Sequence, residues 1–156
     1  MELKLYTDDS GFDALHDDWN TLLARSRSNT LFLTWEWQTT WWRCLGEGDL
    51  WLLAWYDEDR PVAIAPLYLH RDATGLRRFD LVGCVEVSDY LDLIVEQDRE
   101  QAVSSALLDW LDSDACPAWG VTGLCNLAET SLTHRLLPEL AAGRGWEAVT
   151  SMEDVC

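Results

Sequence analysis

The chain has 156 residues and a formal net charge of −17, from 28 acidic and 11 basic residues. This length suits one domain with a single hydrophobic core. The acidic residues are spread along the sequence. This distribution indicates a solvated surface and excludes nucleic acid as a partner, because such binding begins with basic side chains that neutralise phosphates. We also expect no membrane insertion, since no apolar run approaches the roughly 20 residues of a spanning helix.

The cysteine pattern and the first residues predict a cytoplasmic protein with reduced thiols. The cysteines are odd in number, widely spaced and without a C-x-x-C pair: Cys44, Cys84, Cys116, Cys125 and Cys156. The segment Met1–Lys4 lacks the basic and apolar regions of a signal peptide. Thiols of cytoplasmic proteins stay reduced, so we expect no disulfide.

The first 30 residues predict a strand, a helix and a polar connector. Glu2–Tyr6 has the pattern of a short strand. Asp9 or Ser10 can cap the helix that follows. The apolar stripe of that helix consists of Phe12, Leu15, Trp19, Leu22 and Leu23. Arg25–Thr30 is polar and connects it to the next helix.

A second helix is predicted after Thr34, whose hydroxyl suits the N-cap position. Glu36 lies in the first turn, where a carboxylate complements the helix dipole. Trp37, Trp41 and Leu45 follow at helical spacing. The glycines Gly46 and Gly48 end the helix.

The next segment is dense in strand patterns. Leu50–Tyr56 is apolar on both faces, which is typical of an interior strand. After a turn at Asp57–Arg60, the segment Val62–His70 predicts a second strand. Pro66 marks an edge or a bulge in it, because proline cannot donate to the ladder. Further strands are expected at Leu76–Val82 and Tyr90–Val95.

The last third of the chain changes to helical periodicity. A helix capped by Asp98 carries its apolar face on Ala102, Val103, Ala106, Leu107, Trp110 and Leu111. Trp119–Leu124 predicts a buried strand, and a last helix from Leu132 bends or restarts near Pro138. A final strand begins at Trp146–Thr150. This order predicts a single α/β layered domain over residues 1–156, with a mixed central sheet flanked by helices.

Several short motifs carry a resemblance to a known family. They are Phe32–Trp37 with Trp41 and Trp42, Pro61–Leu69, Leu81–Gly83 and Asp89–Asp92. Together with the element order, they resemble the N-terminal half of the bacterial GNAT-like acetyltransferase family associated with cellulose and exopolysaccharide biosynthesis, which is related to FemAB-type tandem-GNAT proteins. The motifs fall between Trp19 and about Leu124, and no single one is diagnostic. The resemblance implies the GNAT fold, that of acyl-CoA N-acyltransferases.

The resemblance also implies a larger protein, because members of that family carry a second GNAT-like half. The sequence stops at Glu153–Cys156, just after a predicted strand begins. We therefore expect a truncated chain or one half of a split pair, and the alternative is a naturally short protein. The expected partner is the missing C-terminal GNAT half, or another copy bound through an exposed apolar face.

In catalytic members of the fold, the resemblance implies a glycine-rich, basic loop before a helix that holds the diphosphate of coenzyme A. At this position the chain has Val95–Gln101, with no glycine, three carboxylates and one arginine. Carboxylates suit the helix start, but they repel a diphosphate by about a few kcal/mol at separations of roughly 4–6 Å. We therefore expect no cofactor on this chain, with acetyl-CoA bound by the complete protein.

Asp92 is the first candidate for acceptor binding. In a strand Tyr90–Val95 it shares a face with Tyr90 and Ile94, while Asp89 lies opposite. A carboxylate in an apolar strand needs partners. Asp92 is therefore either hydrogen-bonded structurally or open in a cleft, where it can bind an amine or a hydroxyl. Tyr90 adds a phenolic hydrogen bond there or packs in the core with an exposed hydroxyl.

The second predicted helix supplies further candidates: Trp35, Glu36, Trp37 and Trp41, beside Trp42. Aromatic faces near a carboxylate can hold a sugar ring or a cationic amine. One stripe of this helix must be core, and the other covers a groove or docks against the missing half. No metal site is predicted, because the spacing of Cys116, Cys125 and His134 matches no zinc pattern. No catalytic residue is identified.

These features predict the non-donor-binding half of an acyl-CoA-dependent acetyltransferase or related acyltransferase. The complete enzyme would transfer an acyl group to an amine or hydroxyl acceptor, for example on a sugar or polysaccharide precursor. The acceptor attacks the thioester directly, helped by a general base. This chain alone is expected to be inactive. Two alternatives stay open: a non-catalytic carbohydrate-binding or scaffold module, and a complete small N-acetyltransferase with an atypical phosphate loop.

Overall fold

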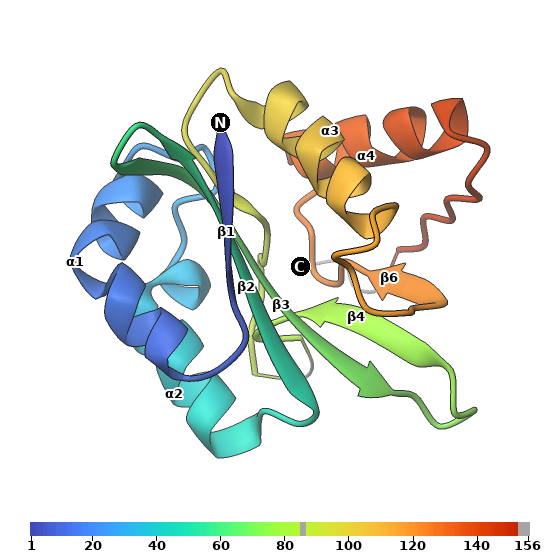
Figure 1. Ribbon diagram of the computed structural model, residues 1–156, viewed down its shortest axis with the longest axis horizontal. Coiled ribbons are helices and arrows are strands. Elements are labelled where there is room, and N and C mark those ends of the chain that lie inside the picture. Colours follow the sequence, from blue (N-terminus) through green and yellow to red (C-terminus); the bar gives the residue numbers. More distant parts are fainter. Residues whose placement is uncertain (85–86, 153–156) are drawn as a thin grey trace.

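The computed structural model describes residues 1–84 and 87–152. A mixed sheet of six strands lies between α1 and α2 on one face and α3 and α4 on the other (Figure 1). The strands are β1 (Glu2–Tyr6), β2 (Asp49–Asp57), β3 (Arg60–Arg71), β4 (Arg77–Leu81), β5 (Ile94–Val95) and β6 (Val121–Gly123). The helices are α1 (Ser10–Ala24), α2 (Trp35–Leu45), α3 (Glu100–Leu111) and α4 (Leu132–Gly143), with a short 3-10 helix at Leu31–Leu33. The predicted layered α/β architecture is confirmed.

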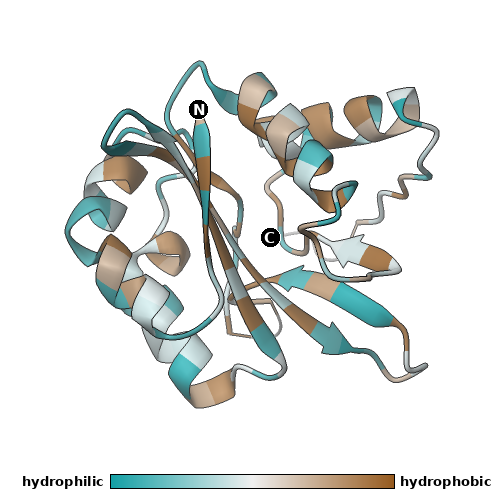
Figure 2. Cartoon of the chain, viewed as in Figure 1, coloured by the Kyte–Doolittle hydropathy of each residue, from teal (hydrophilic) through white to brown (hydrophobic). Residues whose placement is uncertain are grey.

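The hairpin of β2 and β3 forms the centre of the molecule. Six of the nine residues of β2 and nine of the twelve residues of β3 are buried, as the predicted interior strands require. In Figure 2 the turns are mostly hydrophilic, while apolar colours recur along these central strands. The turn between them is tight, with Glu58 in the left-handed region at φ 56°. Burial on both faces explains why β2 and β3 lack strict polar alternation.

Pro66 lies at neither an edge nor a bulge, so that part of the prediction is wrong. It pairs with Leu52 of β2 in regular register, and the register shift of this ladder falls between Trp55 and Tyr56. The carbonyl of Pro66 accepts from the Val82 N–H at 2.8 Å. A strand residue directs its N and its carbonyl to the same side, so the missing donor faces away from β2. Proline is tolerated because β3 changes partner there, from β5 to β4.

The strand predicted at Tyr90–Val95 is only two residues long. β4 and β5 both pair with β3, and between them residues 82–84 and 87–93 lie outside the named strands; we call these residues the excursion. Tyr90 has φ 54°, in the left-handed region that a strand cannot contain. Residues 85 and 86 lie outside the described part of the chain.

The C-terminal third also departs from the predicted elements. β6 covers only three residues of the predicted strand and runs parallel to β4. α4 runs through Pro138 as one helix and does not restart there. Trp146–Thr150 forms no strand. The cap of α3 is Arg99, which makes no side-chain capping bond, so the predicted capping role of Asp98 is wrong.

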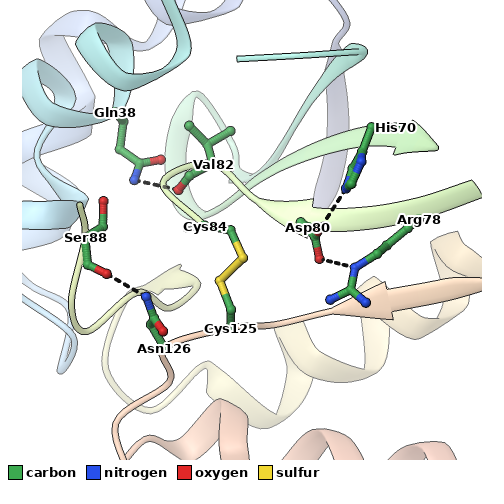
Figure 3. Close-up of a disulfide and its surroundings, with 9 residues drawn as sticks. All are labelled: Gln38, His70, Arg78, Asp80, Val82, Cys84, Ser88, Cys125 and Asn126. Carbon is green, nitrogen blue, oxygen red and sulfur yellow. Dashed lines mark hydrogen bonds and ion pairs between the residues drawn. A yellow bond between two sulfur atoms is a disulfide. The ribbon is translucent and has the colours of Figure 1, made fainter. Parts of the chain in front are cut away.

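A disulfide joins Cys84 to Cys125, so the expectation of reduced thiols is wrong for this pair (Figure 3). β4 and β6 are parallel neighbours, so the chain leaves both strands at the same end of the sheet. This brings two cysteines that are 41 residues apart in sequence to a Cα separation of 6.0 Å, which is typical of disulfides. Within the described residues, Cys44 and Cys116 are free thiols.

Across the described ranges, no helix combines the length and the apolar character needed to cross a membrane.

Candidate functional site

A cavity of about 250 Å³ opens between the start of α3, the excursion and the loop before α4. We call it the Asp92 pocket. Its lining is rich in hydroxyl groups and comprises Ser26, Arg27, Ser28, Thr30, Tyr90, Leu91, Asp92, Leu93, Val95, Glu100, Ala128, Thr130, Ser131, Leu132 and Thr133. Three segments far apart in sequence therefore meet at one site.

Asp92 is both hydrogen-bonded and part of a cleft wall, which joins the two alternatives that the sequence left open. Its side chain is buried, with 4% of the residue exposed. One carboxylate oxygen accepts from the hydroxyls of Ser28 and Ser131, each at 2.6 Å, and the other accepts from the Leu93 N–H at 2.7 Å. No basic side chain of the described residues forms an ion pair with it. Hydroxyl and backbone donors therefore compensate the charge of Asp92.

Ser131 connects the pocket to α4. Its hydroxyl oxygen accepts from the His134 N–H at 3.3 Å, which caps the helix, while the same hydroxyl donates to Asp92. Ser28 is held in turn by its own N–H, which donates to the Ser26 hydroxyl at 3.1 Å. The carboxylate therefore joins two chain segments that both line the pocket.

Tyr90 and Asp89 lie at the surface. Tyr90 is 47% exposed and lines the pocket, so it is not packed in the core. Its backbone carbonyl accepts from the Thr30 hydroxyl at 3.1 Å. Asp89 is exposed and does not line the pocket. The predicted shared face of Asp92, Tyr90 and Ile94 does not form, because this segment is not a strand.

The aromatic residues of α2 do not line the pocket. The indole N–H of Trp35 donates to the Phe12 carbonyl at 2.8 Å, and that of Trp37 donates to the Ser88 hydroxyl at 2.9 Å. Trp41 is buried against Tyr68, with ring centroids 5.6 Å apart.

Thr34 caps α2 as predicted, with its hydroxyl oxygen accepting from the Trp37 N–H. Glu36 is exposed and accepts from the Asn20 amide at 2.9 Å, which lowers the pKa of this carboxyl. With their indole N–H groups used internally, Trp35 and Trp37 connect α2 to α1 and to the excursion.

The start of α3 forms one side of the pocket and is surrounded by internal ion pairs. Arg27 donates to Asp98 and to Glu100, both at 2.9 Å. Glu96 pairs with Arg60, whose hydrogen bond is the main cause of the lowered pKa of the Glu96 carboxyl. Arg99 turns away to Asp57 and Glu96. The basic side chains at this helix start are therefore already paired with carboxylates.

The start of α3 differs from a typical diphosphate-binding helix start. The residues before it contain no glycine, and the left-handed position of the turn is taken by Asp98, at φ 70°. An incoming diphosphate would meet the carboxylates of Asp98 and Glu100 and would have to displace them from Arg27.

The described residues contain no group of three or more His, Cys, Asp or Glu that could hold a metal ion. Of the residues considered for such a site, Cys125 is used by the disulfide.

Sequence reasoning missed the partners of Asp92. Ser131 carried a usable signal, since a serine directly before an apolar helical stripe is a typical N-cap. Ser28, Arg27 and Glu100 carried none, because their positions depend on how α1, α3 and the excursion pack together.

Comparison with known proteins identifies the fold. No protein-family model matches the chain, and no curated protein matches it. Solved structures do match along the whole chain. One is a ribosomal-protein-alanine N-acetyltransferase from Brucella melitensis biovar Abortus 2308, with 15% identity and a TM-score of 0.56 over 100% of this chain and 99% of that one.

Another is the aminoglycoside acetyltransferase HMB0005 from an uncultured soil metagenomic sample, with 16% identity and a TM-score of 0.60, covering 100% and 99% of the two chains. A third is described as a probable acetyltransferase, with 14% identity, a TM-score of 0.57 and coverage of 100% and 96%. At these identities the likeness shows the fold alone, which is the GNAT fold of acetyltransferases.

Proposed function

We propose that this chain is the acceptor-binding domain of an acyl-CoA-dependent acyltransferase and does not itself bind the acyl donor. The fold shared with acetyltransferases supports the acyltransferase class. The observation that carries the donor-free part is the acidic start of α3. There, Asp98 and Glu100 occupy Arg27, and no glycine opens the backbone to a diphosphate.

The Asp92 pocket is the proposed place of the acceptor, an amine or a hydroxyl compound. Two bonds to Asp92 come from Ser28 and Ser131 and a third from a backbone N–H, which leaves carboxylate acceptor capacity for a further donor. Tyr90 lines the same pocket and is 47% exposed. Sugar or polysaccharide precursors belong to this acceptor class.

The donor would come from a second GNAT-like half, the proposed partner of this chain. In the complete protein the acceptor nucleophile attacks the thioester carbonyl, the acyl–sulfur bond breaks and the thiolate leaves. The residues of this chain bind and orient the acceptor, and its proton passes to a base that is not assigned here.

A thermal melt of the isolated chain with excess acetyl-CoA tests the donor-free part. We expect no change in Tm, because the chain is proposed not to bind acetyl-CoA. A ligand that did bind, at about 100 times its Kd, would stabilise the fold by about 2.7 kcal/mol and raise Tm. A saturable rise in Tm would refute it. Small amines and alcohols, screened by the same melt, test the acceptor part. A hit should be lost in Asp92→Asn and kept in the exposed control Asp89→Asn, and equal binding by both variants would exclude the Asp92 pocket.

A second candidate is a complete small N-acetyltransferase with an atypical phosphate loop. It is favoured by the coverage of the solved acetyltransferases, since this chain aligns with 96–99% of their lengths. Release of free coenzyme A from acetyl-CoA by this chain alone, in the presence of an acceptor, would select this candidate over the first.

A further inference from the structure

The disulfide lies at one end of a series of contacts that leads to the Asp92 pocket. From Cys125 onward the chain runs beside the excursion. The Asn126 side-chain amide donates to the Ser88 carbonyl at 2.6 Å (Figure 3), and the Leu91 N–H donates to the Asn126 carbonyl at 3.0 Å. Leu91 also forms a parallel bridge with Leu127. The next contact along this pair of segments is Ser131 with Asp92.

The two sides of the disulfide are held very differently. On the Cys84 side, the Gln38 side chain donates to the Val82 carbonyl at 2.9 Å, and Val82 in turn donates to Pro66 of the central strand. On the Cys125 side, the chain leaves β6, a strand of three residues that is only partly buried. The segment 124–131 contains no regular helix or strand. The disulfide therefore attaches a weakly held segment to a firmly held one.

We propose that Cys84 and Cys125 form a redox switch that controls the order of residues 124–133, which include the pocket wall at Ala128 and at Thr130–Thr133. In the oxidised form the bond fixes this segment against the excursion, so that Ser131 meets Asp92. In the reduced form a loop closure over 41 residues is lost, and the segment depends on β6 and a few hydrogen bonds. The wall then opens locally more often than the central strands do.

The reduction is an ordinary exchange with a dithiol reductant. A thiolate of the reductant attacks the sulfur of Cys125, which is more exposed than Cys84, and the Cys84 sulfur leaves as a thiolate that takes a proton. The second thiol of the reductant then attacks the mixed disulfide and frees Cys125. Two electrons and two protons pass to the protein, and the reductant becomes a disulfide.

The other described thiols are Cys44 and Cys116. Burial raises the pKa of the Cys116 thiol to about 11, so it remains protonated near neutral pH and is a poor nucleophile. Cys44 is exposed on α2 and serves as a matched control for thiol chemistry that does not affect the wall.

Hydrogen exchange on the oxidised and dithiothreitol-reduced full chain tests the switch. We expect reduction, and likewise the double variant Cys84→Ser/Cys125→Ser, to increase amide exchange in residues 124–133 at least several-fold. Exchange in β2 and β3 should increase less than exchange in residues 124–133, and Tm should fall by roughly 10 °C. The variant Cys44→Ser should behave like the unmodified chain.

Equal exchange in both redox states would overturn the proposal, as would a thiol titration in which the air-oxidised chain has every cysteine free. If the double variant does not fold, reversible reduction of the unmodified chain still decides the question, because β2 and β3 report folding internally. This readout needs no ligand, so it can succeed or fail independently of the proposed acyltransferase function.

Discussion

Two helices, α3 and α4, begin at the Asp92 pocket. The negative charge near the free N–H groups of the first turn is arranged differently in each. α4 has a side-chain cap, Ser131, which is bonded to the buried carboxylate of Asp92. α3 has no side-chain cap, and two carboxylates at its start, the exposed Asp98 and the largely buried Glu100, are paired with Arg27. The chain thus supplies its own negative charge at both helix starts. A phosphate at either start would therefore meet negative charge, and this is the basis of the proposal that the chain does not bind the acyl donor.

The comparison predicts that removing a charge lowers the free energy of unfolding strongly at the start of α4 and only weakly at the start of α3. Asp92→Ala should have the largest effect, lowering the free energy of unfolding by about 3 kcal/mol or more. It leaves the hydroxyls of Ser28 and Ser131 without their acceptor in a buried site. Urea unfolding measures the loss. The exposed neighbour Asp89→Ala should change stability by less than about 0.5 kcal/mol, and equal losses would contradict the comparison.

Ser131→Ala should have the next largest effect, because it removes the cap of α4 and one donor to Asp92 together. A loss of about 1–2 kcal/mol is expected in the same unfolding experiment. Thr130→Ala, one residue earlier and exposed, is the matched control. If Ser131→Thr, which retains the hydroxyl, were as unstable as Ser131→Ala, the hydrogen bonds would not be the cause.

At the start of α3, Arg27→Gln should cost only about 0.5 kcal/mol, since this arginine is about half exposed. Water and salt weaken its pairs with Asp98 and Glu100. The difference from the unmodified chain should shrink further in 1 M salt. A loss comparable to that of Asp92→Ala would show that the two helix starts are not organised differently.

The smallest expected effect is a pH dependence from Glu96. Arg60 lowers the pKa of this carboxyl in the folded state, so the stability it contributes is present above the unfolded pKa. That contribution is lost as the pH falls through the lower folded value. Chemical unfolding between pH 6 and pH 3 should therefore show a smaller decline in Arg60→Gln than in the unmodified chain. Identical pH profiles would show that the pair of Glu96 with Arg60 does not contribute to the pH dependence of stability.

The sequence predicted what local pattern and composition determine. The stripe from Phe12 to Leu23 predicted α1, Thr34 predicted the start of α2, and apolar runs predicted β2 and β3. It failed where non-local contacts decide. The excursion replaces a predicted strand because Leu91 pairs with Leu127 and Asp92 binds two serines from distant segments.

The candidate site was predicted in part. Asp92 and Tyr90 were identified, and both line the pocket. The α2 residues Trp35, Trp37 and Trp41 were grouped with them, yet they contact Phe12, Ser88 and Tyr68 instead. Helical spacing shows which side chains share a face, but not which neighbour that face meets. The link between Cys84 and Cys125 was missed for a related reason, since it depends on β4 and β6 being adjacent and parallel.

The central claim is that the acidic start of α3 cannot hold a diphosphate, and calorimetric titration of coenzyme A into the isolated chain tests it most directly. We expect no saturable heat for the unmodified chain. Asp98→Gly with Glu100→Gln, which places glycine at the left-handed position and removes two charges, is the variant in which weak binding should first appear. Saturable binding of coenzyme A to the unmodified chain, reduced rather than enhanced in that variant, would contradict the account.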